Sequence, residues 1–143
     1  MKQFLDTSVL VAAFYGEHER HKPSFELFLR QKKRSGFTAA HCLAETYAVL
    51  TGMPGKDRAS PDEALLFLSD VRERLTLIAL DESEYSAALE GAASSGASGG
   101  AVYDALIARC AMKVKAEAIY TWNVRHFSRL GADVAARVKT PSL

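Results

Sequence analysis

The sequence lacks any apolar run of the roughly 20 residues that a membrane-spanning helix requires. Asp6 interrupts the apolar residues near the N-terminus, so we also expect no signal peptide. The sequence therefore predicts a cytoplasmic protein that does not act at a membrane.

Cysteine is scarce, and no group of Cys and His residues has the spacing of a zinc site. Cys42 and Cys110 each lie within an apolar pattern of helical spacing, which is typical of buried, reduced thiols in a cytosolic protein. His18 and His21 could form a weak metal-binding pair. Because no Cys or further His lies near them, we interpret them as solvated residues at the start of a helix.

Excess charge of either sign is also missing, since the net charge of the 143 residues is only +1. A nucleic-acid partner would therefore have to bind a local basic patch. Hydrophobic residues make up 48% and charged residues 24% of the chain, as in an ordinary globular protein. The length suits a single domain over residues 1–143 with a substantial core.

Short apolar segments alternate with amphipathic ones along the whole chain. This alternation predicts an α/β fold with a mostly parallel sheet. The strands are expected at residues 2–5, 36–38, 75–80, 118–121 and 136–139. The helices are expected after Asp6 and over residues 39–51, 61–71, 82–91, 101–115 and 124–130, with a flexible loop at 92–100. A further helix is expected to carry Phe25, Phe28 and Leu29 on one face. Val49 is expected in the core, and capping boxes are expected at Ser60 and Asp81.

The first strand runs directly into Asp6, and two hydroxyl residues follow before a helix begins near Thr7 or Ser8. Ligands of open parallel sheets bind beyond the carboxyl ends of the strands. Asp6 therefore marks the edge of the sheet where a functional site is expected.

Two further acids share the apolar surroundings of Asp6. Glu45 and Asp104 lie on helices, and neither has a Lys or Arg three or four residues away. Burial of a lone carboxylate is unfavourable unless it is paired, protonated or bound to a metal. Asp6 and Asp104 could instead cap helices, but the occurrence of three such acids favours one shared pocket. Oxygen ligands of this kind suit Mg²⁺, which can activate water and stabilise a phosphate during displacement.

Four segments of the sequence resemble the signature segments of PIN domains, and more narrowly those of the VapC-type toxins of bacterial toxin–antitoxin pairs. The resemblance covers essentially the whole chain. It implies a PIN-like fold, with a mostly parallel central sheet of four or five strands between helical layers. The four segments are residues 5–10, 43–45, 99–108 and 121–127.

The resemblance implies a Mg²⁺- or Mn²⁺-dependent endoribonuclease that cuts RNA, forms a homodimer and is blocked by a cognate antitoxin. By position, Asp6 and Asp104 would be the principal metal ligands. Glu45 would bind the metal directly or through water and orient the attacking water, and Ser8 would support the site through its hydroxyl. Asn123 stands where many relatives have a fourth acid.

An amide oxygen can still coordinate a metal or hold a water, but it brings no charge. We therefore expect Asn123 to take part in catalysis beside one tightly bound Mg²⁺, with any second ion arriving with the RNA phosphate.

Residues near the pocket mouth are candidates for binding RNA. Arg125 follows Asn123 closely and could contact phosphate, although an ordinary surface arginine is an equally good interpretation. Arg109 is a weaker candidate because it lies about 140° around the helix from Asp104. Tyr103 and Trp122 could both stack on bases, although core packing is the better interpretation of Trp122.

Two other functions remain open on the residues alone. The chain could be a PIN-like regulatory or binding module with weak or no nuclease activity, acting through its partner and DNA. It could also be a metal-dependent phosphatase or DNA nuclease, because carboxylate–Mg²⁺ chemistry does not itself select one phosphoester. Only the family resemblance favours RNA.

Overall fold

A computed structural model describes residues 1–142 and contains a five-stranded sheet. The strand order is β3-β2-β1-β4-β5, and every neighbouring pair is parallel. The sheet thus has the α/β organisation and the strand number that the sequence predicts. The strands are β1 (Gln3–Leu5), β2 (Gly36–Ala39), β3 (Thr76–Ile78), β4 (Ala118–Tyr120) and β5 (Val138–Lys139).

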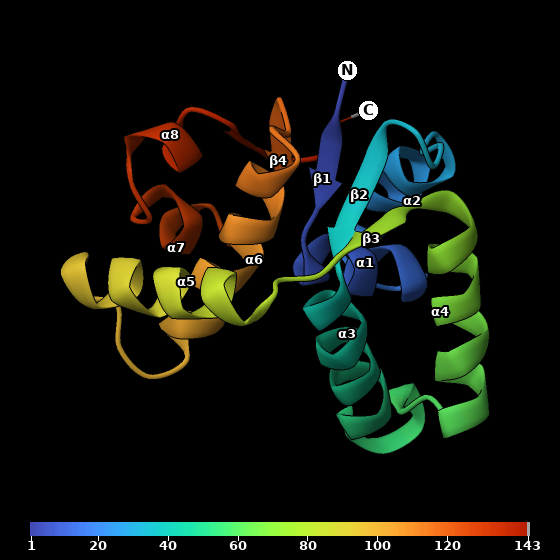
Figure 1. Cartoon of the computed structure of the whole chain (residues 1–143). Helices are drawn as coiled ribbons and strands as arrows, with labels where there is room; N and C mark the ends of the chain where they lie inside the picture. Colours follow the sequence, from blue (N-terminus) through green and yellow to red (C-terminus); the bar gives the residue numbers. More distant parts are fainter. Residues whose placement is uncertain (143) are drawn as a thin grey trace.

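Helices cover both faces of the sheet, with α1 to α4 on one side and α5 to α8 on the other (Figure 1). The chain builds outward from β1 to β3, then returns to β4 and builds outward again to β5. Right-handed crossovers put the helices of these two halves on opposite faces. The helices are α1 (Thr7–Phe14), α2 (His21–Leu29), α3 (Ala40–Gly52), α4 (Pro61–Arg74), α5 (Glu82–Ser94), α6 (Ala101–Lys113), α7 (Val124–Ser128) and α8 (Ala132–Ala135), with a short 3₁₀ turn at Gly55–Asp57.

The central strand β1 lies in the middle of the hydrophobic core. Phe4 and Leu5 have no exposed surface, and Ile119 of the neighbouring strand β4 is equally buried. Phe28 of α2 and Ile107 of α6 extend the core on the two faces of the sheet. This packing fixes the strand end from which Asp6 emerges.

The two cysteines are free and buried, as predicted. Burial raises the pKa of Cys42 to about 12 and that of Cys110 to about 11, so both are protonated at neutral pH. Within residues 1–142, no helix combines the length and the apolar character that a membrane crossing demands.

Some packing predictions were wrong. In α2, Phe28 is buried, but Phe25 and Leu29 are 39% and 43% exposed, because the helix packs through Ser24, Leu27 and Phe28. Val49, predicted as a core residue of α3, is 39% exposed. The predicted loop at 92–100 begins late, since α5 continues to Ser94.

Candidate active site

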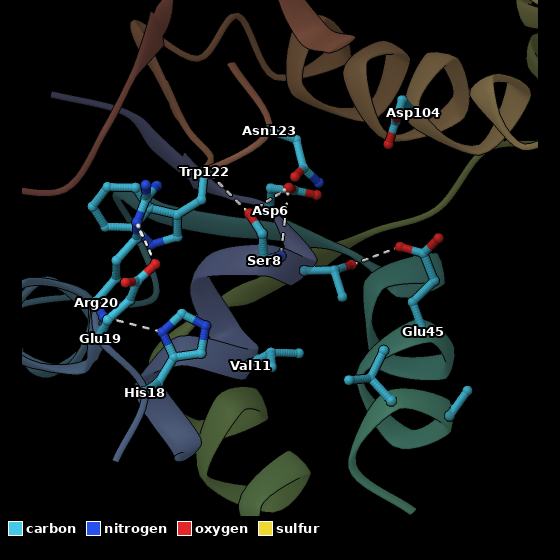
Figure 2. A pocket seen from close by; sticks show the side chains of 13 residues that line it. Asp6, Ser8, Val11, His18, Glu19, Arg20, Glu45, Asp104, Trp122 and Asn123 are labelled. Atoms are coloured by element: carbon cyan, nitrogen blue, oxygen red, sulfur yellow. Dashed lines mark hydrogen bonds and ion pairs between the residues drawn. The ribbon is translucent and has the colours of Figure 1, made fainter. Parts of the chain in front are cut away.

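The acids that the sequence singled out meet at the point where the strand order reverses. Asp6 follows β1, and Asn123 lies just beyond β4, its neighbour in the sheet. Glu45 lies in the second turn of α3, the helix that follows β2, and Asp104 lies in the first turn of α6. All four side chains line one cleft with a volume of about 640 Å³ (Figure 2). Such reversal points are where open α/β sheets bind their ligands.

Asp6 caps α1 and at the same time faces the cleft. It is only 2% exposed, and it accepts hydrogen bonds from the Ser8 backbone N–H at 3.5 Å and the Ser8 hydroxyl at 2.9 Å. The Thr121 hydroxyl donates a third bond at 2.7 Å. Burial raises the pKa of Asp6, although these hydroxyl donors act in the opposite direction. All three donors reach Oδ2, so Oδ1 is the oxygen left for a ligand.

Ser8 links the ends of β1 and β4 through its hydroxyl. Its hydroxyl donates to Asp6 and accepts a 2.9 Å hydrogen bond from the backbone N–H of Trp122. Thr121 also accepts from the backbone N–H of Asn123 at 2.9 Å. These hydroxyls fix the loop that presents Asn123 beside Asp6.

Both carboxylate oxygens of Glu45 have a neighbouring side chain. The Thr7 hydroxyl donates to Oε1 at 2.7 Å, and Nε2 of His41 lies 3.3 Å from Oε2. His41 is one turn earlier on α3, which is the spacing at which helical side chains meet. Glu45 therefore reaches the cleft in a defined orientation, with 30% of its side chain exposed.

Asp104 is the least compensated of the three acids. Its only ion-pair partner among the described residues is His126, whose Nδ1 lies 3.8 Å away and whose side chain is 61% exposed. The pKa of Asp104 rises to about 6, first because of burial and then because of the negative charge of Asp6. The neighbouring His126 works against this rise, and the charge of Glu45 adds to it.

The donor chemistry of the cleft fits a hard divalent cation. Within residues 1–142, no Lys or Arg forms an ion pair with Asp6, Glu45 or Asp104. The same part of the chain holds no group of three or more His, Cys, Asp or Glu side chains close enough together to hold a metal by themselves. Mg²⁺ does not need such a cage, since it keeps several waters and binds one or two carboxylates together with a substrate phosphate.

The predicted RNA-binding residues do not gather in one place. Tyr103 stacks on His41, with ring centroids 5.3 Å apart, and thus lies next to Glu45. Arg125 is exposed on α7, and Arg109 lines a separate cavity with residues of α5 and α8. The three residues remain predictions as RNA contacts.

Several cleft residues were not predicted. Arg20 and His18 line the cleft although the sequence places them in a polar connector. Trp122 also lines it and is half-buried. Thr7 and Thr121 could have been noticed from the sequence, because both are hydroxyl residues within two positions of a strand end. No local pattern distinguishes Arg20.

Comparisons with known proteins agree with this geometry. The family model of the PIN domain matches residues 4–133. The chain belongs to the PIN-domain family. This PIN domain is 38% identical to ribonuclease VapC40 of Mycobacterium tuberculosis over 102 residues, which cover 71% of the chain and 72% of the relative. It is 32% identical to ribonuclease VapC27 of the same species, over 79% of each chain.

Solved structures share the fold of this PIN domain at low sequence identity. VapC20 of Mycobacterium tuberculosis, a toxin that cleaves the sarcin–ricin loop, has a TM-score of 0.72 and 17% identity, covering 87% of this chain and 92% of its own. VapBC2 of Rickettsia felis, bound to a DNA fragment from their promoter, has a TM-score of 0.67 and 19% identity, and the match covers 99% of this chain and 100% of the matched chain. The family and fold that the four sequence segments predict are thereby confirmed.

Proposed function

We propose that this chain is the toxin of a toxin–antitoxin pair and an endoribonuclease that hydrolyses RNA phosphodiester bonds with the help of Mg²⁺ or Mn²⁺. The observation that carries the proposal is the convergence of Asp6, Glu45 and Asp104 at one sheet edge without a Lys or Arg ion-pair partner within residues 1–142. Relatives named ribonucleases favour RNA over other phosphoesters.

Each side chain has a distinct part in this proposal. Asp6, through Oδ1, and Asp104 would hold the cation, and Asn123 would add an uncharged oxygen at the cleft. When bound, the cation supplies charge stabilisation at the phosphate and lowers the pKa of water. Glu45, held by Thr7 and His41, accepts a proton from the attacking water and keeps that water oriented.

The partners follow from the same assignment. The VapBC2 assembly supports an antitoxin as the partner of this chain, and we propose that this partner blocks the cleft. We further propose a homodimer acting in the cytoplasm, where RNA is available and where the free thiols of this chain would stay reduced.

The test is cleavage of a single-stranded RNA by the purified protein with Mg²⁺, compared with the variants Asp6→Asn and Glu45→Gln. We expect both variants to lose at least about a hundredfold in rate, since each removes a charge from the reacting site. Asp70→Asn is the matched control, because Asp70 is an exposed residue of α4 outside the cleft.

Equal cleavage by wild type and Asp6→Asn would refute the assignment. A DNA strand and a phosphomonoester, each supplied at the same concentration as the RNA, test the alternatives of a DNA nuclease and a phosphatase. Faster hydrolysis of either one would show that the site serves a different phosphoester. Absence of hydrolysis of all three, with the protein folded, would favour the binding-module alternative.

A further inference from the structure

We propose that Arg20, positioned over the ring of Trp122, binds an RNA phosphate next to the one that is cut. The inference rests on the proposed ribonuclease function. It assigns to the α1–α2 connector a part in substrate binding that the acids of the cleft cannot perform.

Arg20 lies in the same cleft as the acids. Asp6, Asn123, Trp122 and Arg20 all line it. In the view of Figure 2, Arg20 and Trp122 lie on one side of Asp6, and Glu45 and Asp104 lie on the other. An RNA backbone that passes over Asp6 would therefore place one phosphate near the acids and another near Arg20.

The position of Trp122 is set by the active site itself. Its backbone N–H donates to the Ser8 hydroxyl at 2.9 Å, and Ser8 in turn holds Asp6. Its indole N–H donates to the hydroxyl of Ser24 at 2.9 Å, and Ser24 is fully buried. The ring is thus fixed at both ends and provides a rigid surface for the arginine.

The guanidinium of Arg20 lies over this ring, with its central carbon 4.4 Å from the ring centroid. A cation over an indole face is attracted by the ring, and the planar edge of the guanidinium stays available for other partners. The only acid in an ion pair with Arg20 within residues 1–142 is Glu19, at 3.7 Å. Glu19 is 82% exposed, so water competes strongly for this pair.

Charge explains why such a residue is needed. Four carboxylates that repel RNA line the cleft, those of Asp6, Glu19, Glu45 and Asp104. A bound cation can offset them only at the phosphate it touches. Among the described residues that line the cleft, Arg20 is the one Lys or Arg. Its fork of N–H donors matches phosphate oxygens, which it can bind in a bidentate manner. The neighbouring phosphate is therefore the ligand that this geometry suits.

The experiment measures steady-state cleavage of a fluorophore–quencher single-stranded RNA with Mg²⁺ for Arg20→Ala, Arg20→Lys and the control Arg72→Ala. Arg72 is exposed on α4 and lies outside the cleft. We expect Arg20→Ala to raise KM by about tenfold and leave kcat nearly unchanged, because the bond it removes is one to a charged group. Arg20→Lys should restore only part of the affinity, because lysine binds phosphate as a point charge.

Salt dependence separates a phosphate contact from a structural role. Removing one phosphate contact on a single strand should reduce the slope of log(1/KM) against log[salt] by about 0.7. An unchanged KM, or a raised KM with an unchanged slope, would overturn the inference. If wild type cleaves RNA and Asp6→Asn does not, an unaffected Arg20→Ala refutes the Arg20 contact alone. If wild type fails to cleave RNA, the proposed function and this inference fall together.

Discussion

Replacing Asp104 with Asn should abolish activity but stabilise the metal-free protein. In the folded state the carboxylate of Asp104 ionises next to Asp6 and Glu45 and in a half-buried position. Its only ion-pair partner within residues 1–142 is the exposed His126 at 3.8 Å. An amide of nearly the same shape removes the charge and leaves the helix sequence otherwise intact.

The size of the effect follows from the pKa of Asp104, which rises from 3.8 to about 6 on folding. Because the folded state holds the proton more tightly, Asp104 costs no stability below pH 3.8. The cost grows as the pH rises to about 6 and is then constant. A rise of this size corresponds to about 3 kcal/mol at most.

Two effects reduce this value. One fifth of the Asp104 side chain is exposed, so solvent screens part of the repulsion. Asp104 also lies in the first turn of α6, where a negative charge is favoured by up to about 1 kcal/mol. We therefore expect Asp104→Asn to stabilise the protein by about 1–2 kcal/mol at pH 7, which raises Tm by about 2–6 °C.

The assay is thermal unfolding of wild type and Asp104→Asn in EDTA at several pH values from about 4 to 8, which span the pKa shift. The gain in Tm should be small at the acidic end and should grow until the pH passes the folded-state pKa of about 6. Adding Mg²⁺ should raise Tm of wild type more than that of the variant, since a ligand stabilises the state that binds it. Asp70→Asn, an exposed change on α4, serves as the control and should show neither effect.

A lower Tm for Asp104→Asn at neutral pH would refute the reasoning. A gain of equal size at the acidic and alkaline ends of the series would do the same, because it would show that the ionised carboxylate is not the source of the cost.

Three further substitutions test other contacts. Thr7→Val removes the 2.7 Å hydrogen bond to Glu45 and should lower kcat at least about tenfold with little change in KM, measured in the RNA cleavage assay. Gly36→Ala would place its Cβ 2.6 Å from Oε1 of the buried Gln31, and should cost about 1–3 kcal/mol in urea unfolding. Ser60→Ala removes the capping box of α4 and should cost about 1 kcal/mol in the same measurement, with the cleavage rate unchanged.

The alternation of strands and helices could be predicted because it is a local property of the sequence. The capping boxes at Ser60 and Asp81 were also local and are present as expected. Which side of a short helix is buried was harder to predict. The nine residues of α2 carry apolar side chains on more than one face, and only its packing against α1 selects Leu27 and Phe28.

The acids of the site could be predicted because each is a charged residue within an apolar segment. A charge in such surroundings can be recognised from the sequence alone. Arg20 could not be recognised in this way, because it lies in a polar connector where a charged residue is ordinary. Its relation to the site depends on its contact with Trp122, which is far away in the sequence. That contact in turn depends on hydrogen bonds from Trp122 to Ser8 and Ser24, which exist only once the sheet is assembled.

The hydrogen-bond partners of Asp6 are neutral hydroxyls, so they leave its negative charge unbalanced. A lysine or arginine next to Asp6 would satisfy its charge but would occupy the space that a cation requires. Hydroxyls of Ser8 and Thr121 instead fix the carboxylate through Oδ2 and contribute no positive charge. A fourth carboxylate in place of Asn123 would add to the repulsion that already raises the pKa of Asp104 to about 6. The amide keeps an oxygen at the cleft without that added cost, so the proposed binding of a cation and the stability of the metal-free fold depend on the same residues.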